Sequence, residues 1–293
     1  MKIAHINNIS GIGTELSKSQ RLQGHLSDVY VFNQKIYKQF GGIKVNYMSP
    51  FSRWKIFNRL KEYDIWHYHY PYGSLKVNLE KRNQGKVYIK HYHGDDLRGK
   101  FDAEFCLVST PDLLQYAPNA QWLPTPVCID NKISISENLP KAKLRLAHYP
   151  YYRMYEHEDL YSEILDSLQN TGDYEIVRIL GLTHEETLRM ISTCDIVVGK
   201  IIPNIGWFGR FELEGMALGK PVITYVSDEL YDKYRPPVLR TNSKNFKRDL
   251  LSLLDDIHLQ HKLANEGIQY VKDYHSIKTI LGILDKVYKR QNF

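Results

Sequence analysis

The chain has 293 residues, of which 43% are hydrophobic and 25% are charged, and its formal net charge is +6. This balance is that of a globular protein, and the length is enough for two domains of ~100–200 residues each. No apolar stretch approaches the ~20 residues that a membrane-spanning helix needs, and the first residues lack the apolar core of a signal peptide, so we expect a cytoplasmic protein. The positive charge favours anionic partners, such as a nucleotide diphosphate, an anionic lipid surface or a nucleic acid, without choosing among them.

Three cysteines are spread far apart, and no Cys-x-x-Cys pair occurs. An odd number at this spacing supports neither a disulfide framework nor a zinc site. We therefore expect Cys106, Cys128 and Cys194 to be small core residues.

Strands alternate with helices along the first half of the chain. The expected strands are residues 1–9, 28–32, 43–47, 64–70, 86–92 and 105–109. The expected helices begin at about residue 14 and cover residues 52–62 and 75–84. A polar, irregular segment over residues 130–143 then predicts an interdomain linker.

The alternation restarts after this segment. The expected strands are residues 144–148, 174–180, 195–198 and 221–225. The expected helices are residues 159–169, 184–192 and 211–218, followed by an almost wholly helical tail from about Asn245. This order predicts two α/β units with mostly parallel sheets, helices on both faces, and a ligand cleft at the carboxyl ends of the strands.

One segment of the carboxyl half carries the strongest functional pattern. Gly206 and Gly209 lie in a loop before a short helix, whose unpaired N–H groups and dipole favour an anion. Arg210 stands at the start of this helix and can clamp a phosphate with its fork of donors. Glu214 can accept two hydrogen bonds from a ribose diol. Alternatively, Glu212 and Glu214 only complement the helix dipole.

The run Glu214-Gly-Met-Ala-Leu-Gly-Lys-Pro-Val-Ile resembles the donor-binding motif Glu-Ala-Met-Ala-x-Gly-x-Pro-Val-Ile of group 1 (family 4) retaining glycosyltransferases of the GT-B fold. The resemblance covers residues 144–225 well and the amino half more loosely. It implies two facing Rossmann-like domains with an interdomain cleft. Residues 1–129, with a terminal helix of about 277–293, would form the acceptor domain, and residues 130–276 the nucleotide-sugar donor domain.

The resemblance also implies roles within the motif. Glu214 would bind the ribose of a nucleoside-diphosphate sugar, and Arg210 would face the diphosphate or the sugar. The loop expected beside them is Gly206, Trp207, Phe208 and Gly209. The residues expected against the nucleobase are Leu180, Gly181 and Leu182. The donor is a co-substrate, and neither a metal ion nor another cofactor is expected.

The sequence departs from the family at functional positions. The first glutamate of the family's Glu-x7-Glu pattern falls on Gly206, so its role in contacting the transferred sugar is vacant or filled from elsewhere. The Lys-Gly that usually follows the first strand of this domain is missing. Arg153 supplies a positive charge there, and Lys200 is a plausible substitute for the lysine. The alternative for Lys200 is a solvated loop lysine. These cations would stabilise the departing diphosphate.

The amino half adds a Gly-x-Gly loop, Gly11 and Gly13, after the first expected strand. By itself this signal is weak, but in the family the matching loop approaches the donor phosphates. The run Lys90-His-Tyr-His-Gly-Asp-Asp resembles a strand-end element whose histidine faces the transferred sugar, which assigns that role to His93. The alternative is a hydrogen-bonded structural histidine. The aspartates that follow are expected to cap the next element.

Two histidine pairs, His67 with His69 and His91 with His93, lie at strand ends, and the members of each pair point to the same face. Four histidines could supply the three or four ligands of a zinc site. No helical His-Glu-x-x-His and no cysteine accompany them. We therefore expect no metal site.

A basic and aromatic helix over residues 52–63 includes Trp54, Lys55 and Lys61. Such a helix can lie on an anionic membrane surface, or it is a packed helix with a solvated basic side.

The expected function is a retaining, metal-independent glycosyltransferase of the hexosyltransferase type, with a glycan or lipid-linked acceptor in cell-surface glycan biosynthesis. We expect it in the cytoplasm or at the inner face of the membrane. The alternative is a catalytically weakened protein that binds sugar nucleotides or acts as a scaffold. Nucleic acid is not expected as a partner because no nucleic-acid-binding motif accompanies the basic surface.

Overall fold

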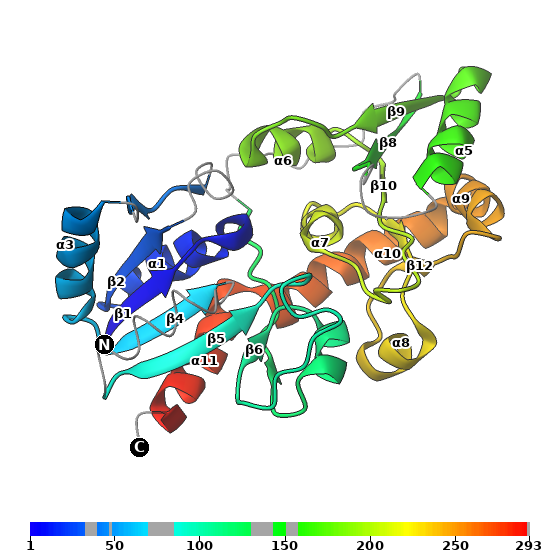
Figure 1. The fold of residues 1–293 in the computed structure, drawn as a ribbon. Helices are drawn as coiled ribbons and strands as arrows, with labels where there is room; N and C mark the ends of the chain where they lie inside the picture. The colour runs from blue at the N-terminus through cyan, green and yellow to red at the C-terminus, as the bar shows by residue number, and fades with distance from the viewer. Residues whose placement is uncertain (33–39, 47–48, 70–84, 130–142, 151–157, 292–293) are drawn as a thin grey trace. The chain divides into compact units, whose positions relative to one another are not determined.

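The computed structural model of the chain describes residues 1–32, 40–46, 49–69, 85–129, 143–150 and 158–291 (Figure 1). The chain divides into two compact units. Unit 1 comprises Met1–Pro126 and Ser276–Phe293, and unit 2 comprises Val127–His275. The last helix of the chain therefore belongs to the first unit.

Unit 1 is a parallel sheet covered by helices. Its strands are β1 (Lys2–Ile6), β2 (Leu26–Val31), β3 (Ile43–Lys44), β4 (Ile65–His69), β5 (Val87–Tyr92), β6 (Leu107–Val108) and β7 (Gln121–Trp122). Its helices are α1 (Ile12–Leu22), α3 (Pro50–Leu60) and α11 (Ile277–Gln291), with 3-10 turns η1 (Ile9–Gly11) and η3 (Pro111–Tyr116). The strand order is β3-β2-β1-β4-β5-β6-β7, and every pairing in this sheet is parallel.

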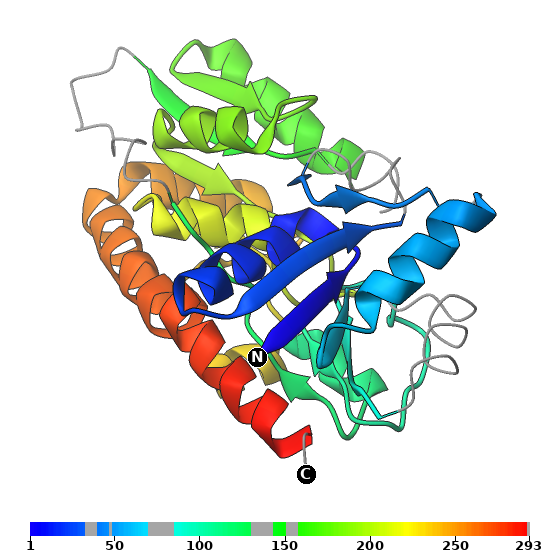
Figure 2. The same cartoon turned by 90° about the vertical axis from the view of Figure 1, so that its left-hand side faces the viewer.

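The core of unit 1 lies on both faces of this sheet, because successive strand side chains point to opposite sides. Ile3 of β1 packs with α1 and α11, whereas Ala4 and Ile6 pack with α3. Figure 2 shows α3 on one side of β1 and β2, with α1 and α11 on the other. The two-residue period places His5 on the same face as Ile3, toward α1 and α11.

Unit 2 repeats this architecture with fewer strands. Its strands are β8 (Leu144–His148), β9 (Tyr174–Arg178), β10 (Ile196–Val198), β11 (Val222–Thr224) and β12 (Leu239–Arg240). Its helices are α5 (Glu158–Thr171), α6 (His184–Ser192), α7 (Arg210–Ala217), α8 (Asp228–Tyr234), α9 (Phe246–Asp255), α10 (Ile257–Tyr270) and the π-helical turn η4 (Val271–His275). The order is β12-β11-β10-β8-β9, again with parallel pairings throughout.

The helices of unit 2 form two layers around the sheet. Helices α6, α7 and α10 pack on one face, around Val197 and Met216. Helices α5 and α9 pack on the other face, around Leu165 and Phe246. Where α7 crosses β10, a Cβ atom added at Gly215 would lie 2.7 Å from Cγ2 of Val197. Glycine at this position therefore allows the close approach of helix and strand.

The predicted α/β class with parallel sheets is confirmed, and most expected elements are present with slightly shorter bounds. The short strands β7 and β12 and the helix α8 were not expected. Cys106 and Cys194 are buried as expected, but the prediction for Cys128 is wrong because its side chain is exposed. The expected helix at 75–84 and most of the expected linker lie outside the described residues. No described helix is long and apolar enough to cross a membrane.

Candidate functional site

A buried glutamate connects two loops at the carboxyl edge of the sheet in unit 2. Glu212, in the first turn of α7, is fully buried. Its Oε2 accepts a hydrogen bond of 2.9 Å from the backbone N–H of Gly209, the N-cap residue of the helix. Its Oε1 accepts one of 2.7 Å from the N–H of Lys200, which follows β10. Glu212 therefore holds the loop after β10 against the start of α7.

Glu214 lies two residues further along α7 and is 3% exposed. Its Oε1 accepts hydrogen bonds of 2.6 Å from both Nε of Arg210 and Nε2 of His184, the first residue of α6. Burial by itself would raise the pKa of Glu214, but His184 and Arg210 outweigh it and hold that pKa below its ordinary value. The side chain is therefore an anion at neutral pH, oriented by two donors from different helices.

The ammonium group of Lys200 lies over the start of α7. A Cβ atom added at Gly209 would lie 2.6 Å from Nζ of Lys200. The first N–H groups of a helix have no intrahelical partner and carry partial positive charge, which favours an anion. Lys200 and Arg210 therefore place two cationic side chains beside a helix end that itself attracts anions.

The loop after β9 presents apolar side chains at the same edge of the sheet. Leu180 is 48% exposed and Leu182 is 38% exposed. Gly181 between them has φ +68°, a left-handed conformation that favours glycine. The capping box of Thr183 and Glu186 then begins α6. Two exposed leucines at a strand end are available for contact with a flat apolar ligand group.

The aromatic residues of the glycine loop pack into the core. Trp207 is 3% exposed and Phe208 is 2% exposed, and their rings stack with centroids 4.5 Å apart. Gly206 before them has φ +74° and lies against Ser227. A ligand at this loop can therefore meet the backbone of these residues but not the two rings. Arg153, another expected cation, lies outside the described residues.

His184 is a candidate functional residue that the sequence analysis missed. The capping-box pattern Thr183-x-x-Glu186 indicates a helix that starts at His184, with its side chain at the carboxyl edge of the sheet. What the pattern could not show is that α6 and α7 approach each other closely enough for His184 to reach Glu214.

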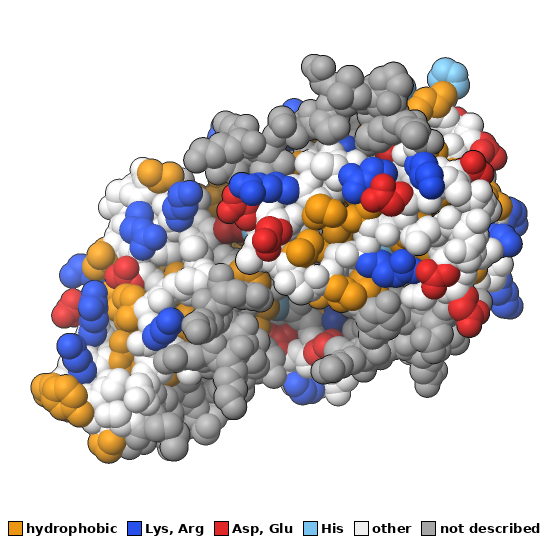
Figure 3. Space-filling view, turned by 90° about the horizontal axis from the view of Figure 1, so that it is seen from above, with side chains coloured by type: hydrophobic (Ala, Val, Ile, Leu, Met, Phe, Trp, Pro, Cys, Tyr) orange, Lys and Arg blue, Asp and Glu red, His pale blue; other side chains and the backbone are white. Residues whose placement is uncertain are grey.

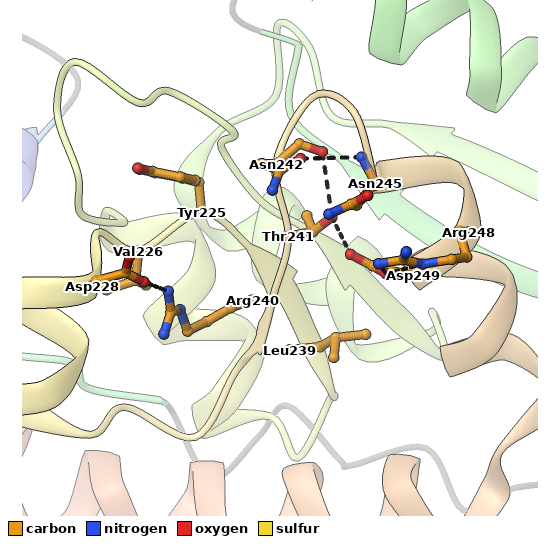
Figure 4. A pocket seen from close by; sticks show the side chains of 10 residues that line it. All are labelled: Tyr225, Val226, Asp228, Leu239, Arg240, Thr241, Asn242, Asn245, Arg248 and Asp249. Atoms are coloured by element: carbon orange, nitrogen blue, oxygen red, sulfur yellow. Dashed lines mark hydrogen bonds and ion pairs between the residues drawn. The ribbon is translucent and has the colours of Figure 1, made fainter.

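A polar cavity of 370 Å³ lies at the carboxyl ends of β11 and β12 (Figure 4). Its lining is Tyr225, Val226, Asp228, Leu239, Arg240, Thr241, Asn242, Asn245, Arg248 and Asp249. None of the residues predicted to bind the donor is among them. Two of its arginines are paired within the lining, Arg240 with Asp228 and Arg248 with Asp249. The cavity is therefore separate from the motif around Glu214.

In unit 1, the expected histidines meet in one buried cluster that also includes His5. All five rings lie on the sheet face toward α1 and α11. His69 is central, with Nε2 3.0 Å from Nδ1 of His5 and Nδ1 3.0 Å from Nε2 of His93. Nε2 of His67 lies 3.1 Å from Nδ1 of His91. Both ring nitrogens of His93 have partners, since Nδ1 also lies 2.6 Å from Oγ of Ser109.

The ring nitrogens of the cluster lie at hydrogen-bond distances from one another, and the first of two triads with the spacing of metal ligands is unfavourable for a metal ion. Two triads, His5–His67–His69 and His69–His91–His93, bring their nitrogen atoms within 4.8 Å of one another. A zinc ion binds about 2.0–2.1 Å from each nitrogen, in the plane of the ring. The rings of His67 and His69 are stacked with only 7° between their planes, so no single point satisfies both nitrogens. The nitrogens pair with one another instead.

The Gly-x-Gly loop of unit 1 lies beside this cluster. Gly11 has φ +77° and caps α1. A Cβ atom at Gly13 would lie 3.1 Å from Oδ1 of Asn8 and 3.5 Å from the ring of His69. On the other side, the carboxylate of Asp96 accepts hydrogen bonds from the N–H groups of His93 and Gly94. Asp96 thus holds the turn directly after β5, whereas it was expected to cap the next element.

No protein-family model and no curated protein matches the chain by sequence. Solved structures match it over nearly its whole length. A glycosyltransferase from Rickettsia africae superposes with a TM-score of 0.68 at 12% identity, covering 99% of this chain and 98% of that one. HepE of Anabaena, in complex with UDP and glucose, gives 0.64 at 11% identity, with 99% of each chain covered. A sucrose-phosphate synthase from Thermosynechococcus elongatus gives 0.63 at 13%, with 99% of each covered. This similarity shows that the chain has the GT-B fold.

Proposed function

We propose that the chain is a glycosyltransferase that moves a sugar from a nucleoside-diphosphate sugar to an acceptor hydroxyl. The observation that carries the proposal is the anionic, buried Glu214 at the start of α7, with Lys200 and Arg210 beside the same helix end. A carboxylate that accepts hydrogen bonds from a ribose diol, next to cations that attract a diphosphate, is the pair of groups that a nucleoside diphosphate needs. The fold that the chain shares with glycosyltransferases supports the same proposal.

Each group has a defined task in this mechanism. Glu214 orients the donor through its ribose. Lys200, Arg210 and the N–H groups at the start of α7 stabilise the charge that develops on the diphosphate as the sugar leaves. Leu180 and Leu182 pack against the nucleobase. The cations act at the leaving group, so the acceptor proton can pass to the diphosphate without a dedicated carboxylate base.

Finer features belong to the same proposal. The resemblance of the Glu214 motif to group 1 transferases supports transfer of a hexose with retention at the anomeric carbon, without a metal ion. The anomeric configuration of the product, read by NMR, tests retention. Activity that persists in excess EDTA tests independence of a metal, and activity restored only by a divalent cation would contradict it.

Thermal shift with a panel of nucleoside diphosphates and their sugars tests donor binding directly. A ligand at 100 times its dissociation constant stabilises the folded state by ~2.7 kcal/mol, a readily measured shift. We expect at least one donor to stabilise the protein, and the Glu214→Ala variant to lose that shift. Glu185→Ala, at an exposed glutamate of α6 paired with Arg189, is the matched control and should keep it. Binding that is equal in both variants would refute the role of Glu214.

We also propose that the acceptor is reached at an anionic membrane surface, the inner face of the membrane in a cytoplasmic enzyme. On α3, Phe51 is 71% exposed and Trp54 is 61% exposed, and their rings stack with centroids 6.2 Å apart. Lys55 and Lys61 are exposed on the same stretch. Figure 3 shows Lys and Arg side chains together with exposed hydrophobic side chains at the left, where α3 lies in Figure 1. Exposed aromatic rings flanked by lysines favour an interface with anionic lipid.

Sedimentation with lipid vesicles tests this surface. We expect binding to vesicles that contain phosphatidylserine, weaker binding in high salt, and little binding to pure phosphatidylcholine. Trp54→Ser should weaken binding, whereas Leu22→Ser, at an apolar side chain of α1 that is 83% exposed, serves as the control. Equal binding of both variants would contradict the proposal. A glycan acceptor in solution is then the remaining candidate.

One observation favours a second candidate function, a sugar-nucleotide binding protein with weak or no catalysis. Gly206 stands where the family has its first glutamate, and it lies against Ser227 rather than an acidic side chain. Donor binding without donor hydrolysis or transfer would support this candidate. Turnover with any donor and acceptor pair would exclude it.

A further inference from the structure

The histidines of unit 1 form one continuous hydrogen-bond chain, which we call the histidine chain. In order, its members are Gln20, His5, His69, His93, Ser109, His91, His67 and Tyr288. The contacts between them are 2.6–3.1 Å long, and every ring nitrogen of the five histidines takes part. The chain runs from α1, across the carboxyl ends of β1, β4, β5 and β6, to α11.

The end at Gln20 sets the direction of the histidine chain. Oε1 of Gln20 accepts a hydrogen bond from Ser27 and lies 2.8 Å from Nε2 of His5, so His5 must donate through Nε2. A neutral imidazole that donates through one nitrogen accepts through the other. Nδ1 of His5 therefore accepts from His69, and the same rule passes along the chain to Tyr288, whose hydroxyl donates to Nδ1 of His67. All five histidines are then neutral Nε2–H tautomers.

Most links of the histidine chain cannot accept another proton. In the three histidine–histidine links, an added proton would place one N–H group against another N–H group. Only the hydroxyls of Ser109 and Tyr288 can turn to accept from a doubly protonated ring. At most two of the five rings can therefore be doubly protonated while the hydrogen bonds of the histidine chain stay intact.

We propose that the histidine chain is a pH-sensitive switch, which holds unit 1 folded while its histidines are neutral and opens it in mild acid. The proposal is independent of glycosyl transfer. It rests on the geometry of the links and on burial, since His5, His67, His69 and His91 have no exposed surface and His93 is half-buried. An unfolded chain can protonate all five rings, so opening in acid takes up at least three protons.

Among the residues that the structure describes, no carboxylate forms a hydrogen bond or ion pair with a ring of the histidine chain. Burial lowers the pKa of His5, the hydrogen bond to Gln20 opposes this, and the positive charge of Arg21 on α1 lowers the pKa further. Arg21 is paired with Asp28 of β2. On α11, burial raises the pKa of Tyr288, and the negative charge of Asp285 raises it further. Two neutral hydroxyls also join the network, Ser27 on β2 and Ser109 directly after β6.

Burial is the main cause that lowers the pKa of every ring in the chain, to about 4 for His5 and about 3 for His93. A histidine whose pKa is lower in the folded than in the unfolded state favours folding above the unfolded value of ~6.5 and loses that contribution as the pH falls. The sign therefore agrees with opening in acid.

The test measures the equilibrium constant for unfolding by urea between pH 7.5 and pH 5. With at least three protons taken up, this constant should rise by about 10³ per pH unit below pH ~6. The His5→Gln variant removes a ring that cannot take a second proton in the intact histidine chain, and it should reduce the rise by about tenfold per pH unit. The control, His258→Gln at an exposed position of α10, should leave the rise unchanged. Hydrogen exchange should show β4 and β5 losing protection before β8 and β10.

Side-chain NMR of the wild-type protein at pH 7.5 tests the geometry without any variant. Five Nε2–H tautomers support the proposal, and an Nδ1–H tautomer in any of the five would overturn it. A rise of tenfold or less per pH unit, or one stoichiometric metal ion held by the purified protein at the cluster, would also overturn it.

Discussion

Two helices of unit 2 begin with a glutamate at the third position that accepts a hydrogen bond from the N-cap N–H, in opposite surroundings, which allows a matched test. At the start of α6, the carboxylate of Glu186 is exposed and accepts from the N–H of Thr183 at 2.8 Å. At the start of α7, Glu212 is fully buried and accepts from Gly209 and from Lys200. Replacing each glutamate by alanine removes the same chemical group from water in one case and from the protein interior in the other.

The expected loss of folding stability is large only for the buried Glu212. A hydrogen bond to a charged group contributes ~1.5–3 kcal/mol, and Glu212→Ala removes two of them and leaves two N–H groups unpaired. We expect the free energy of unfolding to fall by ~3–6 kcal/mol, a large part of the ~5–15 kcal/mol of a typical domain. Glu186→Ala should cost much less, because water replaces the lost acceptor.

Urea unfolding of the two variants at pH 7 measures the difference. Glu212→Gln keeps one acceptor and should lie between Glu212→Ala and the wild type. Donor binding should weaken in the Glu212 variants even where they remain folded, because the carboxylate also positions Lys200 over the start of α7. Equal losses of stability in the Glu186 and Glu212 variants would refute the reasoning.

Further predictions concern packing and thiol chemistry. Gly215→Ala adds a methyl group where α7 meets β10 and should destabilise the protein by ~1–3 kcal/mol, and a melting temperature equal to that of the wild type would contradict the close approach. In the folded protein, a thiol reagent should modify Cys128 quickly, because its side chain is exposed. Cys106 and Cys194 should react only on unfolding, since burial raises the pKa of both thiols to about 11. Fast reaction of all three thiols in the folded protein would contradict the burial of Cys106 and Cys194.

Local patterns predicted the fold well where one signal determined an element. The strand 144–148 and the helix 184–192 have the expected bounds, because a short apolar run and a capping box respectively mark them. The strands β7 and β12 have only two residues each, too few to show a period. They belong to the sheet because they pair with neighbouring strands, and the local sequence does not show this pairing.

The candidate sites were predictable in part for the same reason. The motif around Glu214 is contiguous in sequence, so its residues could be proposed together. The histidine chain is not contiguous, because His67 meets Tyr288 across 221 positions. Strand alternation predicted that the histidines of a pair share a face, but not that His5 of another strand joins them. Likewise, the glycine loop was expected to face a ligand, and only packing shows that the ring of Trp207 faces inward.

The membership of α11 in unit 1 has a consequence for synthesis on the ribosome. All of unit 2 leaves the exit tunnel before Ile280, Leu281 and Leu284, which complete the core of the earlier unit. Each such side chain contributes ~1.5–3 kcal/mol when buried, so the nascent first unit lacks a substantial part of its apolar contacts until α11 has been made. Tyr288, the donor end of the histidine chain, arrives after these residues. The later-made half of the protein is therefore ready to fold before the earlier-made half can finish.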